Sequence, residues 1–283
     1  MNDKWLNQLP IGKIVSGSPV GGGDVNQAYH LRTQADDYFL LVQPGKTGDF
    51  YASEIAGLKE LAEANISAPK VLGNGEIDGS AYLLLNFLDR GQGSQRDLGQ
   101  LVAKLHQHFS LNGQFGFQTP YQGSDLSFDN SWTDSWSEIF VNRRLDYLKD
   151  LIISKHHWSQ SDLERYQAAR EVIIAELSKH QSEPSLLHGD LWGGNYIFLT
   201  DGQPVLIDPD CLYGDREFDL GITTVFGGFT FDFYEAYQEL FPLDDGYQFR
   251  LNFYRLYYLM VHLNKFGLDY ASSVRTALNK IIQ

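Results

Sequence analysis

Three polar side chains in the middle of the sequence have the types and spacing that phosphoryl transfer requires. Asp190 and Asn195 lie five positions apart in a polar loop after an apolar run at 186–187, and Asp208 follows a second apolar run at 205–207. A carboxylate can accept the proton of a substrate hydroxyl, and an amide oxygen and a second carboxylate can coordinate a hard cation. This order matches the phosphoryl-transfer template, in which Asn and the second Asp hold the metal ion. The sequence therefore predicts metal-assisted phosphoryl transfer with Asp190 as the general base.

A purely structural role for the same residues is the alternative. Asp and Asn are frequent in turns because their side chains bond nearby backbone groups, and Asp208, which precedes Pro209, can simply end a strand. A single Asp would favour that interpretation. The complete pattern H-x-D-x-x-x-x-N, followed by a hairpin and a strand that ends in Asp, favours the chemical one.

Apolar periodicity divides the chain into a strand-rich first part and a largely helical second part. The strands are expected at 14–18, 27–33, 38–42, 71–75 and 81–87, and a catalytic hairpin at 186–207. The helices are expected at 52–64, 97–109, 132–153, 161–179, 231–241, 247–266 and 271–282, with 113–130 irregular. Strands first and helices later predict an α+β fold.

The motif around Asp190 resembles that of the fructosamine kinase family. It reads His188-Gly-Asp-Leu-Trp-Gly-Gly-Asn195 with Ile207-Asp-Pro209, and the stretches at 213–220, 226–229 and 262–267 follow in the order of that family. The family, also called ketosamine kinases, is a branch of the protein-kinase-like fold that includes aminoglycoside and choline kinases. The resemblance implies a two-lobed α+β protein with a small strand-rich nucleotide-binding lobe at 1–89 and a larger, mostly helical catalytic and acceptor-binding lobe at 90–283.

The resemblance also implies roles for individual residues. ATP would be the donor and Mg²⁺ the ion, with Asn195 and Asp208 as its ligands. The implied nucleotide-binding residues are Gly21, Gly22, Gly23, Glu54, Asn86, Phe87 and Leu88. The implied acceptor-binding residues are Trp192, Asp210, His262 and Lys265. For Asp210, a place in the metal shell, a contact with the acceptor's amine and a solvated turn all remain open.

Leu41 is the main departure from the family pattern, because it stands where a Lys normally pairs with the helix Glu and holds the nucleotide phosphates. Lys46, just beyond the strand, could swing back to replace it, and Lys46→Ala would then abolish nucleotide binding. Otherwise the protein would use ATP poorly.

The primary expectation is an ATP-dependent kinase for ketosamines, the sugar adducts of amines or lysine. The alternatives are a pseudokinase or binding protein, and a kinase for another hydroxyl acceptor such as an aminoglycoside or choline.

Charge and cysteine content limit the remaining possibilities. The 283 residues carry a formal net charge of -14, which argues against binding to nucleic acid or anionic membranes, since both need clustered Lys and Arg. No apolar run approaches the length of a membrane span. Cys211 is the single cysteine, so no intramolecular disulfide can form. We expect a small-molecule substrate and a reducing, cytoplasmic location.

Overall fold

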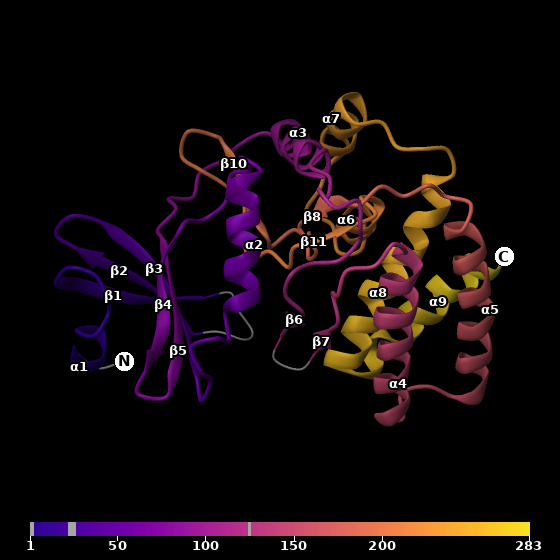
Figure 1. The fold of residues 1–283 in the computed structure, drawn as a ribbon, viewed down its shortest axis with the longest axis horizontal. Helices are drawn as coiled ribbons and strands as arrows, with labels where there is room; N and C mark the ends of the chain where they lie inside the picture. The colour runs from indigo at the N-terminus through magenta and orange to yellow at the C-terminus, as the bar shows by residue number, and fades with distance from the viewer. Residues whose placement is uncertain (1–2, 22–26, 124–125) are drawn as a thin grey trace. The chain divides into compact units, whose positions relative to one another are not determined.

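The computed structural model describes residues 3–21, 27–123 and 126–283. The chain divides into two compact units, one formed by Met1–Gly93 with Ile197–Ile207 and the other by Ser94–Tyr196 with Asp208–Gln283. The first contains a five-stranded sheet and the second is mostly helical (Figure 1). The predicted α+β fold is therefore confirmed. Gly22 and Gly23 of the predicted phosphate loop lie outside the described residues.

The first unit is built on an antiparallel sheet with the strand order β1-β2-β3-β5-β4. Its strands are β1 (Ile14–Val20), β2 (Gln27–Thr33), β3 (Asp37–Pro44), β4 (Val71–Ile77) and β5 (Ser80–Asn86), and its helices are α1 (Asp3–Leu6) and α2 (Ala52–Glu63). Successive side chains of a strand point to opposite faces. Leu40 and Val42 accordingly pack with Trp5 of α1 in one cluster, whereas Phe39 and Leu41 pack against the cluster that includes residues of α2 on the other face.

The hairpin of β9 (Tyr196–Phe198) and β10 (Pro204–Leu206) extends from the second unit into the first. Each strand of the hairpin makes a backbone hydrogen bond within the first unit. Gly91 N donates to Phe198 O at 2.7 Å, and Leu206 N donates to Ser67 O at 3.0 Å. The predicted hairpin thus returns the chain to the second unit at Asp208.

Helices form most of the second unit. They are α3 (Gln95–His106), η1 (Glu138–Leu145), α4 (Asp146–Ser154), α5 (Gln160–Leu177), α6 (Glu217–Thr223), α7 (Phe231–Leu240), α8 (Tyr247–Phe266), η2 (Leu268–Tyr270) and α9 (Ala271–Ile282). Helix α8 packs against α4, α6 and α9, and α5 packs against α9 (Figure 1). Two short sheets complete the unit, β6 (Tyr121–Gln122) with β7 (Ser127–Phe128) and β8 (Ser185–Leu187) with β11 (Leu212–Gly214).

Some elements of the second unit differ from the sequence prediction. The helix expected from Trp132 begins at Trp136 and passes through the π-helical η1 before α4. The segment expected to be irregular contains β6 and β7, and α6 was not predicted. Among the described residues, no helix combines the length and apolar character needed to cross a bilayer.

Candidate active site

A single buried carboxylate fixes the backbone of the loop that carries Asp190. The loop leaves β8, which is paired with β11, and Asp219 of α6 accepts hydrogen bonds from His188 N at 2.7 Å and Gly189 N at 2.9 Å. Asp219 is fully buried and also contacts His106 Nε2 at 3.1 Å. Bonds from backbone N–H groups to an ionised carboxylate are stronger than neutral ones. Asp219 therefore determines where Asp190 lies.

The Asp190 carboxylate is held by Asn195. Asn195 Nδ2 donates to Asp190 Oδ2 at 3.0 Å and to its backbone O at 2.8 Å. Burial and the nearby Asp208 charge raise the pKa of Asp190 to about 7, although Asn195 and Tyr258 oppose the shift. A general base is most effective when its pKa lies near the working pH. The geometry and the pKa of Asp190 both suit that role.

Asp208 and Asp210 bring two more carboxylates to the same region. The Asp208 backbone adopts the left-handed conformation with φ of 55°, and Asp210 N donates to His188 O at 2.8 Å. Burial raises the pKa of Asp210 to about 8; Arg144 opposes the shift, while Asp190 and Asp208 reinforce it. Clustered carboxylates repel one another, and a cation among them relieves the repulsion. With Asn195 bonded to Asp190 through Nδ2, its Oδ1 is the atom that it can offer to a cation, so the donor set fits a hard divalent ion.

Arg144 is part of this region and was not predicted from the sequence. Its side chain is buried, Nη2 donates to Asn130 Oδ1 at 2.6 Å, and the guanidinium lies 5.2 Å from the Phe128 ring centroid. Among the described residues, Nη1 has no hydrogen-bond partner. Arg144 lies in the π-helical η1 among buried apolar residues such as Phe140, so the available signal was an Arg inside an apolar segment and not its place in an α-helical period.

The predicted acceptor-binding residues lie in two places. Trp192 is 39% exposed, and its ring covers Gly194 so closely that a Cβ there would lie 2.2 Å from the ring. Asp210 lies beside Asp190, as described above. His262 belongs to an aromatic cluster with Phe226, Tyr258, Phe266 and Tyr270. Its Nδ1–H donates to Tyr258 O at 2.8 Å, and burial lowers its pKa.

The ammonium group of Lys265 is exposed near the end of α8. Its Nζ lies 5.0 Å from the Phe266 ring centroid. Lys265 therefore borders the aromatic cluster.

The predicted nucleotide-binding residues of the first unit lie on its strands and on α2. Gly21 follows β1, and Glu54 lies in the first turn of α2. Asn86 ends β5, where its Oδ1 accepts from Lys70 N at 2.6 Å. Phe87 stacks on His30 with a centroid separation of 3.7 Å, and Leu88 is half-buried. Their contact with a nucleotide remains a prediction.

Leu41 makes apolar contacts where the family pattern has a Lys. Its side chain packs against the cluster that contains Tyr51 and Ile55. The ammonium of Lys46, the proposed substitute, lies 5.5 Å from the Phe50 ring centroid. In this structure Lys46 thus rests on an aromatic ring of its own unit.

Comparison with known proteins identifies the family. The model of the fructosamine kinase family matches residues 3–283. This chain belongs to the fructosamine kinase family. It is 57% identical to a probable ketoamine kinase of Staphylococcus aureus, over 100% of this chain and 99% of that protein, and 32% identical to a chloroplastic protein-ribulosamine 3-kinase of Arabidopsis thaliana, over 93% and 82%. A crystal structure described as a putative fructosamine-3-kinase from Haemophilus somnus has a TM-score of 0.85 at 26% identity, and the match covers 96% of this chain and 92% of that one.

The sequence-based identification of the family is therefore confirmed. The protein is a fructosamine-3-kinase-like phosphotransferase. As a kinase it uses ATP as the phosphoryl donor together with a divalent metal ion.

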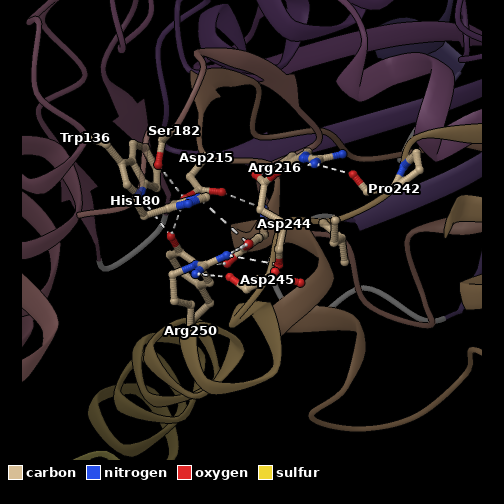
Figure 2. A network of polar contacts seen from close by, with 12 residues as sticks. Trp136, His180, Ser182, Asp215, Arg216, Pro242, Asp244, Asp245 and Arg250 are labelled. Atoms are coloured by element: carbon tan, nitrogen blue, oxygen red, sulfur yellow. Dashed lines mark hydrogen bonds and ion pairs between the residues drawn. The ribbon is translucent and has the colours of Figure 1, made fainter. Parts of the chain in front are cut away.

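A second buried polar network joins the segment before β8 to β11, α6 and α8 (Figure 2). Asp215 accepts from Ser182 Oγ at 2.7 Å and from the Tyr254 hydroxyl at 2.9 Å, and His180 Nε2 lies 3.2 Å from its carboxylate. Arg250 forms a bidentate ion pair with Glu217, with Nε–Oε2 at 2.9 Å and Nη2–Oε1 at 2.6 Å.

The same network contains three groups that could in principle ligate a metal. The ligand atoms of His180, Asp215 and Glu217 lie within 4.8 Å of one another. However, the Glu217 carboxylate already accepts from the guanidinium of Arg250, and the Asp215 carboxylate already accepts from the hydroxyls of Ser182 and Tyr254. A cation would have to displace these donors and lie beside Arg250. We therefore assign the network to structural support.

His180 should make the stability of the kinase depend on pH. Burial lowers its pKa, but the hydrogen bond to Asp215 and the charges of Asp215 and Glu217 outweigh burial and raise it. A pKa that is raised in the folded state gives stability that is complete below the unfolded value and is lost as pH rises through the folded value. We expect His180→Gln to lower the free energy of unfolding more below about pH 6 than above about pH 9.

Urea unfolding at both pH values measures this effect. Ser182→Ala is the matched control, because it removes another donor to Asp215 without removing a titrating group. Its loss of stability should be similar at the two pH values. Equal losses for His180→Gln at both would contradict the charged His180–Asp215 pair.

Proposed function

We propose that the kinase transfers the γ-phosphoryl group of Mg-ATP to a sugar hydroxyl of ketosamines, the fructosamine or ribulosamine adducts of amines or lysine. The observation that supports this most directly is the set of Asp190, Asn195 and Asp208 in a chain that is 57% identical, from end to end, to a probable ketoamine kinase. The set has the groups that phosphoryl transfer needs, and the relatives' names indicate the acceptor class.

Asp190 would orient the acceptor hydroxyl and accept its proton as the oxygen attacks the γ-phosphorus. Asn195 and Asp208 would hold Mg²⁺, which neutralises charge on the phosphates. Catalysis would then come mainly from position and charge, since the reaction needs no covalent intermediate with the protein. The half-buried state and raised pKa of Asp190 support its role as a base that can be neutral or charged near pH 7.

The acceptor would lie against the residues predicted for it. Trp192 offers an exposed ring for a sugar face, and Asp210 offers a carboxylate for the acceptor's amine. His262 and Lys265 would border the part of the acceptor farther from the reacting hydroxyl. Gly21, Glu54 and the segment 86–88 would contact the nucleotide.

Leu41 supports the alternative of a pseudokinase, because a Leu cannot bind phosphate. The retained set of Asp190, Asn195 and Asp208 favours an active enzyme, since a binding protein has no need of all three. A calorimetric titration with Mg-ATP separates these two alternatives: metal-independent or absent nucleotide binding would favour the pseudokinase.

An acceptor panel tests the proposed substrate class. ADP formation would be measured with Mg-ATP and fructose-lysine, ribulose-lysine, choline, an aminoglycoside or no acceptor. We expect the two ketosamines to increase ADP formation well above the acceptor-free rate, and choline and the aminoglycoside to leave it near that rate. Faster turnover with choline or the aminoglycoside would contradict the ketosamine assignment and support a kinase for another hydroxyl compound.

A further inference from the structure

Asp219, which holds the loop of Asp190, is itself bonded by a side chain from another helix. Its Oδ1 accepts from Gly189 N at 2.9 Å and its Oδ2 accepts from His188 N at 2.7 Å. His106 Nε2 of α3 lies 3.1 Å from the same Oδ2. Asp219 and His106 are both fully buried, so this contact lies away from bulk water.

The proton in the contact between His106 and Asp219 lies on the ring. Both oxygens of Asp219 already accept a backbone N–H, and an oxygen in that role faces a donor rather than the lone pair of a ring nitrogen. Nε2 of His106 therefore donates to Asp219. The other ring nitrogen, Nδ1, bonds the Tyr237 hydroxyl at 2.8 Å. A hydroxyl can donate or accept, so Tyr237 satisfies Nδ1 and leaves the Nε2–H for Asp219.

The position of the His106 ring is fixed by α7. Tyr237 is 1% exposed, and its ring centroid lies 5.5 Å from that of His106. Helices α3 and α7 pack against each other (Figure 1), so closely that a Cβ on Gly99 would lie 2.2 Å from the Phe233 carbonyl oxygen. This backbone contact fixes the two helices, and with them the two rings. A buried ring held in this way is the rigid support that a functional site needs.

We propose that His106 is a positioning residue for phosphoryl transfer, which donates from Nε2 to Asp219 and so keeps the loop of Asp190 in place. The proposal rests on the proposed function of Asp190, and it assigns His106 no contact with the substrate. Without this donor, the Asp219 carboxylate could turn about its terminal bond, whose torsional preference is broad. Its bonds to the loop would weaken, and the rate would fall because only a narrow range of geometries allows attack.

Two amide side chains at position 106 separate the bond to Asp219 from the bond to Tyr237. The amide nitrogen of Gln reaches the place of Nε2, that of Asn reaches the place of Nδ1, and both variants lose the ring. We expect His106→Gln to keep kcat with the ketosamine within about 3-fold of the wild-type value, and His106→Asn to lower it about 10- to 100-fold. Equal losses in the two variants, or an unchanged kcat in His106→Asn, would overturn the proposal.

Tyr254→Phe is the control for stability. It removes a buried hydroxyl of α8 that bonds Asp215 at 2.9 Å, in a network separate from that of His106. Thermal unfolding should show a lower Tm for both Tyr254→Phe and His106→Asn, but only His106→Asn should lose kcat at a temperature well below both Tm values. If both variants lost kcat in proportion to their loss of Tm, the effect of His106 would be one of stability and the proposal would be wrong.

Hydrogen exchange of the loop amides tests the proposal without any substrate. The amides of His188 and Gly189 are the ones bonded to Asp219, and an amide exchanges when its bond opens locally. We expect both to exchange about 10-fold faster in His106→Asn than in the wild type, and near the wild-type rate in His106→Gln. Equal acceleration of these amides and those of α8, or no acceleration at all, would overturn the proposal.

This test separates the proposal from the proposed function. A wild-type protein that is inactive with ketosamines would contradict the proposed function, whereas the exchange rates would still decide whether His106 holds the loop. Selective acceleration at His188 and Gly189 in His106→Asn would then support the positioning role, and its absence would contradict that role.

Discussion

Asp190→Asn should reduce transfer to the ketosamine by about two to four orders of magnitude, the range that general-base catalysis contributes. The amide has the shape of the carboxylate and can still accept the hydrogen bond from Asn195 through its oxygen, but it cannot take a proton. The variant should fold normally. Removing one charge beside Asp208, whose field helps to raise the pKa of Asp190, should even favour the folded state at alkaline pH.

The measurement is kcat with saturating Mg-ATP and ketosamine, alongside Tm. Asp210→Asn is the comparison, because it removes another carboxylate with a raised pKa from the same cluster. The proposed partner of Asp210 is the acceptor's amine, so Asp210→Asn should raise KM for the acceptor more than it lowers kcat. An Asp190→Asn variant that retained near wild-type turnover would show that another group accepts the proton.

Gly189→Ala should also remove most of the activity, for a steric reason. Gly189 has a φ of 85°, and a Cβ on it would lie 1.8 Å from the Asp210 carbonyl oxygen and 2.6 Å from the Asp210 carbonyl carbon. Backbone cannot yield as a flexible side chain would. The substitution must therefore separate the Asp190 loop from the segment at 208–210. The proposed base, Asp190, then moves away from the proposed metal ligand Asp208.

Gly79→Ala is the control for the backbone conformation alone. Gly79 lies in the turn between β4 and β5 with a φ of 73°, and nothing lies within 4 Å of its Cβ position. It should lose about 1–2 kcal/mol of stability from the left-handed conformation and keep a normal kcat. Gly189→Ala should lose more stability and nearly all turnover. A fully active Gly189→Ala enzyme would contradict the close approach of the two segments.

The sequence was most informative where the functional groups are close along the chain. Asp190, Asn195 and Asp208 fall within one strand–loop–hairpin, so their order and spacing were enough to predict a shared site. Asp219 lies within the stretch 213–220 that follows the family order, but its bonds to the loop are known only from the structure. The structure also gives its partner on the other side, His106 of α3.

Arg144 could not be assigned in the same way. It approaches the site from a helix far from the motif in sequence, and an apolar helical pattern does not indicate which group a buried polar side chain faces. Arg144 lies in a π-helical stretch, whose wider turns shift the residues that face inward and do not follow the usual helical period.

The short elements were missed because they are too short to show periodicity. Strands β6 and β7 have two residues each, and two residues cannot display the alternation of a strand. Helix α6 has seven residues, and all of them are buried, including the charged Glu217 and Asp219. A helix without an exposed face has no amphipathic pattern to detect.

The most direct test of the account is to locate the phosphoryl group on the product. Fructose-lysine and ATP would be incubated with the wild-type enzyme, with Mg²⁺ or with excess EDTA, and the sugar would be analysed by phosphorus and carbon NMR. We predict a Mg²⁺-dependent phosphate ester on a hydroxyl of the sugar, and none with EDTA or with Asp190→Asn. ATP consumption that leaves the ketosamine unmodified would contradict the assignment of this kinase to ketosamines.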